Sequence, residues 1–441
     1  FMPIEVQLEA EVINKRNPPW RESQKNLKDE DYIELYKYLY PFQGDPLLWV
    51  HLNTDYPYNL QGILYFPKIS GRADWESGEI KLYCNQVFVS DSIKEVVPRF
   101  LLPLRGVIDS PDIPLNVSRS ALQTDRRVRS IGNFVAKKVA DRLKSLFEED
   151  KEKYAHIWDS ISPYIKIGAM EDEKFSDQVE NILLYPTTAK INESNQQDID
   201  KQIISCKDSS YTTIKSYLNR LKVDGPKRVL YCTDEISQQS ALNLWKSQGA
   251  EVLKAETVID TQFIPWLESK NSQIKFQRVD AELDDELKDD NSKLLDKDGE
   301  SDIEKIKDVI KNSIKNDKVT IQVQALKGTD APPSLILLPE QMRRINDIGA
   351  LMEQKLPGLP EHHVLVVNKN HSLVEGLMKI NSQQILITPS GDSPSSTLSV
   401  EIAKHIYEMA KLSVGGLEPN EISDFQNRNA DLMGKLMEKA I

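Results

Sequence analysis

Apolar residues recur along the chain at two spacings, one typical of helices and the other of strands. The helical spacing is clearest between residues 131 and 147, where an apolar residue stands at nearly every fourth position, so one face of this helix is expected to be buried. The same spacing predicts helices over residues 29–40, 93–100, 152–164 and 173–184. Alternating or continuous apolar residues predict strands at residues 6–12, 47–52, 60–66 and 80–89, the last three in an antiparallel or mixed sheet.

Residues 104–119 break this pattern. They contain two prolines, Pro111 and Pro114, and several polar side chains, so they are predicted to form an ordered loop rather than a helix or a strand. Trp20 lies in another proline-marked loop. Its ring is expected either to anchor this loop on its own domain or to contact another molecule.

A second region has the order strand, helix, strand, at residues 228–232, 236–249 and 251–254, after a helix predicted at 211–221. This order predicts a small α/β unit with a parallel sheet. The turn at residues 233–235 lacks the glycines of a dinucleotide-binding loop, so no nucleotide site is predicted there. Residues 280–302 then hold eleven acidic residues against three lysines, which favours a solvated linker.

The last third is predicted to be mixed. A helix is expected at residues 303–314 and strands at 318–326, 335–338 and 363–367. Residues 340–356 are amphipathic, with Met342, Ile345, Ile348 and Met352 at helical spacing. Two helices end the chain, and their apolar stripes contain Leu398, Ile402, Ile406, Met409 and Leu412, and then Ile422, Phe425, Leu432, Leu436 and Met437.

Two terminal helices with apolar stripes need a covering surface. Pairing with the same helices of a second copy would give a four-helix bundle, and twofold symmetry is the commonest arrangement of homo-oligomers. The alternative is that the stripes pack back onto their own domain. The sequence favours dimerisation.

Composition limits the class of protein. The chain has 441 residues and a net charge of −12, which fits about three domains and argues against general attraction to nucleic acid. No apolar run is long enough to span a membrane. The three cysteines, Cys84, Cys206 and Cys232, lie far apart, which fits a reducing compartment. No signal peptide follows Phe1, and a start at Phe suggests a fragment of a longer protein.

The sequence has few catalytic signatures. It has no phosphate-binding glycine-rich loop, no nucleophile elbow and no metal-binding histidine pair, and the adjacent His362 and His363 would point apart in a strand. The main candidate is Arg119, a loop arginine before a helix, which is able to act as a finger that completes a nucleotide site elsewhere. Asn116 and Gln123 lie nearby.

Two other interpretations of this basic segment stay open on spacing alone. In the first, the arginines simply cover the start of the helix and pair with acidic neighbours such as Asp109 and Asp112. Alternatively, the segment binds phosphate or RNA, which predicts binding that weakens steeply with salt. This second interpretation uses Arg119, Arg126, Arg127 and Arg129.

One stretch resembles a known family. Leu-Arg-Gly-Val-Ile-Asp-Ser at residues 104–110, Pro-Leu-Asn-Val-Ser-Arg at 114–119 and Leu-Gln at 122–123 resemble the middle domain of the heat-shock protein 90 chaperones, particularly those of bacterial type. The loop around Trp20 and the segments 32–40, 82–83, 87–91, 166–168 and 171–172 are similar too. The resemblance is nearly continuous from about residue 3 to 170 and looser to about 275. Beyond about 305 only the order of elements agrees.

This resemblance implies a multidomain fold of α/β and α+β classes. A middle domain at 1–280 would have a large α/β/α part at 1–150, similar to the ribosomal protein S5 domain 2-like fold, a helical connector at 151–185 and a small α/β part at 186–280. An acidic linker at 281–302 and an α+β dimerisation domain at 303–441, ending in a helical bundle, would follow. An N-terminal ATPase domain would precede Phe1.

The resemblance also implies roles for particular residues. Arg119 would contact the ATP γ-phosphate in the closed dimer, with Asn116 and Gln123 ordering its loop. Trp20, together with Met342, Ile345 and Met352, would contact client proteins. Dimerisation would use the terminal helices through Leu398, Ile402, Ile406, Met409, Phe425, Leu432 and Leu436. Ser120 and Pro111 depart from the family pattern, and the chain lacks the acidic pentapeptide that docks tetratricopeptide co-chaperones.

The sequence-based interpretation is therefore a homodimeric, cytoplasmic, ATP-dependent chaperone that assists protein folding under heat and other stress. ATP with Mg²⁺ would be bound mainly by the missing domain, so this chain alone would hold no cofactor or metal and would not be active as an ATPase. Its partners would be a second copy, unfolded client proteins and other chaperones. The rival interpretation is a nucleotide-independent dimeric scaffold that holds clients passively.

Overall fold

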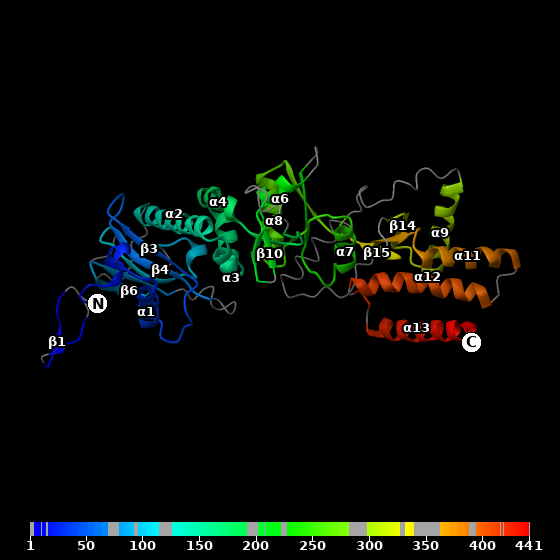
Figure 1. The fold of residues 1–441 in the computed structure, drawn as a ribbon, viewed down its shortest axis with the longest axis horizontal. Coiled ribbons are helices and arrows are strands. Elements are labelled where there is room, and N and C mark those ends of the chain that lie inside the picture. The colour runs from blue at the N-terminus through cyan, green and yellow to red at the C-terminus, as the bar shows by residue number, and fades with distance from the viewer. Residues whose placement is uncertain are drawn as a thin grey trace. The chain divides into compact units, whose positions relative to one another are not determined.

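The structure is a computed structural model of the 441-residue chain. It describes residues 4–9, 11–14, 16–68, 79–91, 96–113, 126–191, 202–207, 209–221, 227–281, 298–326, 331–338, 362–387, 394–414, 416–417 and 419–440. These residues belong to two compact units (Figure 1). The first unit spans 1–184 and 202–216, and the second spans 185–201 and 217–441.

The first unit is built around a five-stranded mixed sheet. Its strands run in the spatial order β3 (Leu48–Thr54), β4 (Leu60–Phe66), β7 (Arg105–Asp109), β5 (Ile80–Cys84) and β6 (Val87–Ser90). Neighbours are antiparallel except β5 and β7, which are parallel. The mixed sheet expected from the sequence is confirmed.

Two predicted single strands are wrong because each contains a chain reversal. Residues 80–89 form the hairpin β5–β6, and the turn residues Asn85 and Gln86 have φ of 50° and 63°. Positive φ at both central positions is the geometry of a tight hairpin turn, and Asn accepts it readily. Likewise, residues 6–12 form the hairpin of β1 (Gln7–Leu8) and β2 (Glu11–Val12), with Glu9 at φ 47°.

The loop predicted over residues 104–119 begins with a strand instead. β7 is buried along its whole length between β4 and β5, so it shows no alternation of apolar and polar residues. Gly106 has φ of 136°, and a Cβ there would lie 2.0 Å from the carbonyl oxygen of Ile63, so only glycine fits. The rest of the predicted loop, from residue 114, lies outside the described residues.

Helices cover both faces of this sheet, as Figure 1 shows for α1 (Asp29–Leu39) and α2 (Arg126–Glu149). Along β4, Tyr65 packs with Tyr36 of α1, at 4.9 Å between ring centres, whereas its neighbour Phe66 lies 6.3 Å from the ring of Tyr164 in α3 (Lys151–Glu171). Successive strand residues point to opposite faces, which gives the expected α/β/α layering.

The helices after the sheet differ from the prediction only in their ends. α2 has the expected stripe buried, and the other helix predictions are met by α3 and by α4 (Glu173–Val179), which a short 3-10 turn (Glu180–Ile182) extends. The helix predicted at 93–100 is wrong in its described part, because Pro98 precedes a single 3-10 turn (Arg99–Leu101). The helix predicted at 211–221 is shorter in the structure, where it is α6 (Ile214–Arg220). Its first predicted residues belong instead to a hairpin of β9 (Ile204–Cys206) and β10 (Ser209–Thr212).

The second unit contains the predicted parallel strands. β11 (Lys227–Cys232) lies between β12 (Leu253–Lys254) and β13 (Ile274–Arg278) and is parallel to both, and β8 (Tyr185–Thr187) is antiparallel to β12. Two helices make the crossovers, α7 (Gln239–Ser247) and α8 (Asp260–Lys270). Of these elements, β11, α7 and β12 were predicted from the sequence, whereas α8 and β13 were not.

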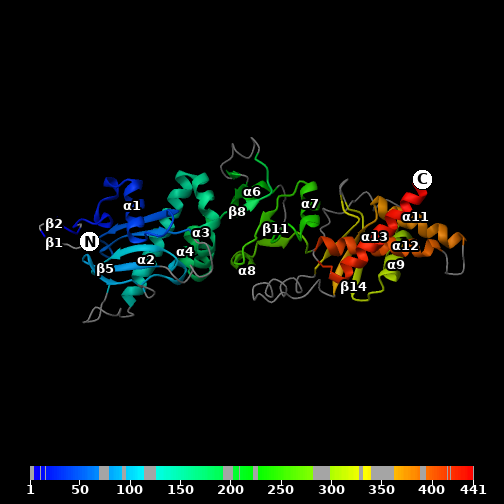
Figure 2. The same ribbon diagram turned by 90° about the horizontal axis from the view of Figure 1, so that it is seen from below.

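A three-stranded sheet completes this unit, in the order β14 (Val319–Gln324), β16 (His363–Asn368) and β15 (Ser334–Leu337). The helices around it are α9 (Asp298–Ile314), α11 (Ser372–Ile387), α12 (Pro394–Ser413) and α13 (Pro419–Ala440), of which only α11 was not predicted. Figures 1 and 2 show α12 beside α9 and α11, and α12 also contacts β15. The amphipathic segment 340–356 and most of the acidic segment 280–302 lie outside the described residues.

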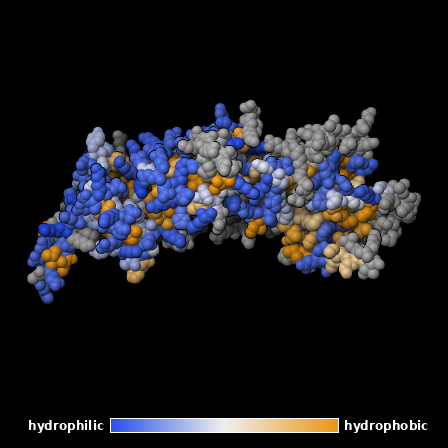
Figure 3. Space-filling view, viewed as in Figure 1, coloured by the Kyte–Doolittle hydropathy of each residue, from blue (hydrophilic) through white to orange (hydrophobic). Residues whose placement is uncertain are grey.

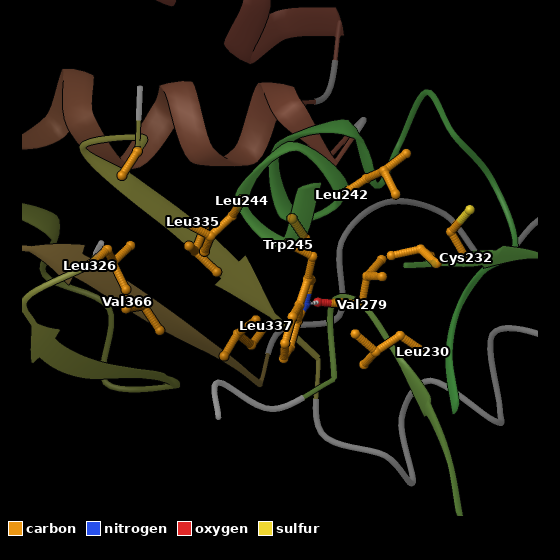
Figure 4. Close-up of a cluster of buried hydrophobic side chains, with 13 residues drawn as sticks. Leu230, Cys232, Leu242, Leu244, Trp245, Val279, Leu326, Leu335, Leu337 and Val366 are labelled. Atoms are coloured by element: carbon orange, nitrogen blue, oxygen red, sulfur yellow. Dashed lines mark hydrogen bonds between the residues drawn. The ribbon is translucent and has the colours of Figure 1, made fainter. Parts of the chain in front are cut away.

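One core joins the two sheets of the second unit (Figure 4). Leu230 and Cys232 of β11 and Trp245 of α7 belong to the same buried cluster as Leu335 of β15 and Val366 of β16. The indole N–H of Trp245 donates to the carbonyl of Val279 over 3.1 Å. Residues on both sides of the predicted acidic linker therefore share one core, while the domain limits given above stay a prediction.

Candidate functional site

The predicted phosphate-contacting loop lies outside the described residues, and so do Asn116, Arg119 and Gln123. The structure describes the two ends of this loop, which are the end of β7 with residues 110–113 and the start of α2 at Arg126. In the first turn of α2, Arg127 and Arg129 are exposed. What the structure shows of this site is therefore how the two ends of the loop are held.

Asp109, the last residue of β7, is the main anchor. It is 1% exposed, and its Oδ2 accepts hydrogen bonds from Arg21 Nε over 3.0 Å and from the indole of Trp20 over 3.4 Å. The backbone N–H of Gln86 also donates to this carboxylate, over 3.2 Å. A buried carboxylate is stable only with such donors. Asp109 therefore ties the Trp20 loop, the β5–β6 turn and the start of the predicted site together.

A second anchor follows directly. The hydroxyl of Ser110 donates to the carbonyl of Asn59 over 2.7 Å, and the Asp112 carboxylate accepts from the N–H of Asn59 over 2.7 Å. Ser110 is fully buried. These contacts fix residues 109–112 against the β3–β4 loop and set where the chain leaves toward Arg119.

This geometry bears on one alternative from the sequence. Asp109 and Asp112 were considered as partners of the arginines at the start of α2. In the described part of the chain, Asp109 binds Arg21, Trp20 and Gln86, and Asp112 binds Asn59. Both carboxylates thus contact the β-sheet side of the site, and their pairing with the arginines stays a prediction.

Trp20 is fully buried, which confirms the anchoring role among the two that the sequence left open. Its ring lies 5.3 Å from Tyr83, and it belongs to a cluster with Tyr32, Tyr36 and Tyr65. Contact with clients through Trp20 stays a prediction, and it requires this loop to leave the position described here.

Asp109 gives a direct test of this anchoring. Replacing Asp109 with Ala leaves Arg21 and the Trp20 indole without their acceptor, so the free energy of unfolding of the first unit is expected to fall by about 2–4 kcal/mol. Urea unfolding of the chain measures this change. Asp45→Ala is the matched control, because Asp45 is an exposed carboxylate whose ion pair with Lys37 lies on the surface, and it is expected to change the stability by less than about 1 kcal/mol. Equal effects of the two variants would refute the anchoring role.

The second candidate site is the pair of terminal helices. Ile406 is fully buried in the core of its own unit, together with Ala403 and Ala410, so one stripe of α12 packs back onto its domain. The other described members of the predicted set are half-buried: Leu398, Ile402, Met409, Phe425 and Leu432. The side chain of Leu436 lies outside the description.

α13 is held on α12 by polar contacts at several points. Arg428 donates from Nε to Glu408 over 3.1 Å, Lys411 binds Glu421 over 2.7 Å, and the ring of Phe425 stacks on His405 at 5.1 Å between centres. Burial lowers the pKa of His405; the charge of Glu408 opposes this shift, and the smaller effect of the Arg428 charge adds to it. These contacts define which face of α13 turns away from α12.

The exposed residues of α13 are of both kinds, with two methionines among polar side chains such as Gln426, Asn429 and Asp431. Met433 and Met437 of α13 are 57% and 63% exposed, and Leu412 and Ile422 near the turn between the helices are 50% and 38% exposed. Figure 3 shows hydrophobic surface over this end of the second unit. Leu412, Ile422 and Met437 were predicted on the apolar stripes. Met433 was not, although it lies one helical turn before Met437 and that spacing marks it.

Two kinds of site find no support among the described residues. No group of three or more histidine, cysteine or carboxylate side chains there is placed to bind a metal ion. Within the same residues, no helix is both long and apolar enough to cross a bilayer.

Comparison with known proteins gives the context of these two sites. The family model described as "Hsp90 protein" matches residues 4–440. The chain belongs to the Hsp90 family. Among curated Hsp90 relatives, the chaperone protein HtpG of Porphyromonas gingivalis is 35% identical over 426 residues, which cover 94% of this chain and 58% of that protein.

Other bacterial relatives give the same picture. The chaperone protein HtpG of Bacteroides fragilis is 36% identical over 386 residues, 84% of this chain and 53% of the relative. That of Treponema denticola is 29% identical over 439 residues, 97% of this chain and 63% of the relative. The chain thus spans somewhat more than half the length of the Hsp90 relatives it matches.

Proposed function

We propose that this chain forms the middle and C-terminal part of an ATP-dependent, cytoplasmic Hsp90 chaperone that assists protein folding under stress. The observation that carries the proposal is the family match over residues 4–440, together with relatives that are named as chaperones. ATP and Mg²⁺ would bind mainly to a preceding domain, and this chain would supply the arginine, the client surfaces and the dimer contact.

In this proposal Arg119 contacts the γ-phosphate and stabilises the charge that develops on the transferred group. The anchoring of residues 109–112 supports it, since a finger residue acts only when its loop has a fixed origin. Asn116 and Gln123 would order the same loop. Client proteins would contact Met342, Ile345 and Met352, and Trp20 once its loop opens.

The test of this function is prevention of aggregation. The full-length protein, purified and mixed with a chemically unfolded enzyme, is expected to suppress light scattering and to release refoldable client only when ATP is hydrolysed. A non-hydrolysable ATP analogue is the control. Equal release with the analogue would instead support the nucleotide-independent scaffold.

Dimerisation through α12 and α13 is the second part of the proposal. The outer face of α13 carries the exposed Met433 and Met437. In a twofold dimer through this face, the methionines of both protomers would be buried. Met433→Ser with Met437→Ser is expected to weaken the dimer of this chain by roughly tenfold or more, because buried methionine contributes about 1.5–3 kcal/mol. Sedimentation equilibrium measures the dissociation constant.

The control for this variant is Tyr56→Ser, which changes an apolar side chain that is 87% exposed in the first unit. It should leave the dimer unchanged, and circular dichroism should show unaltered helix content in both variants. A dimer of unchanged strength in the methionine variant would exclude this face of α13 as the interface.

A further inference from the structure

Two loops of the second unit each expose one large apolar side chain at the same edge of the parallel sheet. Ile236, in the loop after β11, is 83% exposed, and Val258, in the loop after β12, is 69% exposed. β11 and β12 are parallel neighbours, so both loops leave from the carboxyl edge. We call Ile236, Val258 and the carboxylates beside them the carboxyl-edge surface.

Both loops are held in place by side-chain hydrogen bonds. In the first, Asp234 accepts from the N–H of Ile236 over 3.0 Å, and the buried Gln238 bonds twice to Thr233, over 2.9 and 3.0 Å. In the second, the carboxylate of Asp260 accepts from the hydroxyl and the N–H of Thr257, over 2.5 and 3.2 Å. The two apolar side chains are therefore displayed on ordered backbone, which reduces the entropy lost on binding.

The charge beside these side chains is mainly negative. Asp234, Glu235 and Glu256 lie on the two loops, and Lys254 forms an ion pair with Glu235. Burial, and then the nearby charge of Glu235, raises the pKa of Glu256, as expected where carboxylates crowd together. Lys246 is exposed on α7, and its charge, like that of Lys254, acts to lower the pKa of the nearby Cys232. Three carboxylates thus face two lysines, one of which is already paired.

One of the two loops also borders the position at which open α/β sheets bind ligands. The chain runs from β11 through α7 to β12 on one side, and then through α8 to β13 on the other side of β11. Such a change of direction creates a binding position at the carboxyl ends of β11 and β13, so the loop after β11 lies beside it, whereas the loop after β12 is one strand away. The interior below is filled by the core of Figure 4, where Leu230 and Cys232 are buried, so a ligand would lie on the surface.

We propose that the carboxyl-edge surface docks a polypeptide segment in which Lys or Arg residues flank a large apolar side chain. The apolar side chain would cover Ile236 and Val258, and the cations would meet Asp234 and Glu256. A nucleotide or phosphate is the wrong ligand, because its negative charge would face these carboxylates. The inference rests on the proposed function in that the partner is a protein, and it names the class of segment that is bound.

The test uses the whole chain and three fluorescein-labelled peptides of ten residues. The first alternates Lys with Leu, the second replaces Lys with Glu, and the third replaces Leu with Ser. Fluorescence anisotropy without nucleotide is expected to show binding of the first peptide only. Ile236→Ser with Val258→Ser should weaken this binding by about tenfold, and so should Asp234→Asn with Glu256→Gln.

Matched controls keep the result specific. Phe42→Ser with Tyr56→Ser removes apolar side chains that are 97% and 87% exposed in the first unit, and Glu30→Gln with Glu34→Gln removes exposed carboxylates of α1. Neither should change the affinity by more than about twofold. In addition, Glu256→Lys should shift the preference toward the Glu-containing peptide.

Several results would overturn the inference: no binding of the Lys–Leu peptide, equal binding of the Lys and Glu peptides, or equal losses in the control variants. Because the titration contains no nucleotide, these failures leave the ATP-dependent function untouched. Conversely, normal peptide binding with no ATP-dependent release of client would refute the proposed function and keep the docking surface.

Discussion

Alanine in place of Trp245 is expected to lower the free energy of unfolding of the second unit by about 3–5 kcal/mol. Trp245 is 1% exposed, its indole donates to Val279, and the guanidinium of Arg228 lies 5.6 Å from its ring centre. The variant removes the largest side chain of the core that the two sheets share, and it leaves the Val279 carbonyl without its donor.

Which strands lose stability in this variant tests the fold more sharply than the size of the free-energy change. Hydrogen exchange should accelerate both in β11 and in β15 and β16, because residues of all three strands contact the same cluster. Helix α2 of the first unit should keep its protection. Trp266→Ala is the control, since Trp266 is half-buried, and a loss of about 1–2 kcal/mol is expected there. Faster exchange confined to α7 would contradict a shared core.

Alanine in place of Arg119 is expected to reduce ATP turnover of the full-length protein by about 100-fold or more, with nucleotide affinity nearly unchanged. The reason is that a finger arginine interacts with charge that develops only in the transition state, so its loss lowers kcat rather than ground-state binding. Steady-state hydrolysis gives kcat, and equilibrium titration with a fluorescent ATP analogue gives the affinity.

The control is Arg129→Ala, which removes an exposed guanidinium ten residues further along the chain, on α2. It should keep turnover within about twofold of the unaltered protein. Full turnover in the Arg119 variant would remove Arg119 from the mechanism. A loss of affinity equal to the loss of turnover would make it a binding residue instead.

Local patterns were enough for elements that have one buried face. α2 was predicted from its four-residue repeat, and β11 and β12 from the order of strand, helix and strand. β7 was missed because a strand buried on both faces has no alternation, and the prolines after it suggested a loop. The β5–β6 turn was missed although Asn85 marks it, because its flanking residues read as one continuous strand.

The anchors of the candidate site could not be predicted from the sequence at all. Asp109 binds Trp20 and Arg21, which precede it by 89 and 88 positions, and no local pattern reports a contact over that separation. The same holds for Trp245, whose cluster draws residues from both sides of the acidic segment. By contrast, the stripes of α12 and α13 were visible, but only the structure shows that Ile406 faces its own core and Met433 faces outward.

The central claim is that the chain works as the dimeric middle and C-terminal part of an ATP-driven chaperone. It is tested most directly by measuring ATP hydrolysis of the full-length protein with and without residues 419–441, which contain α13 and whose removal leaves the buried stripe of α12 in place. The account predicts slow, magnesium-dependent hydrolysis that falls steeply when these residues are removed and the protein becomes monomeric. Absence of hydrolysis, or hydrolysis just as fast from the truncated monomer, would contradict it.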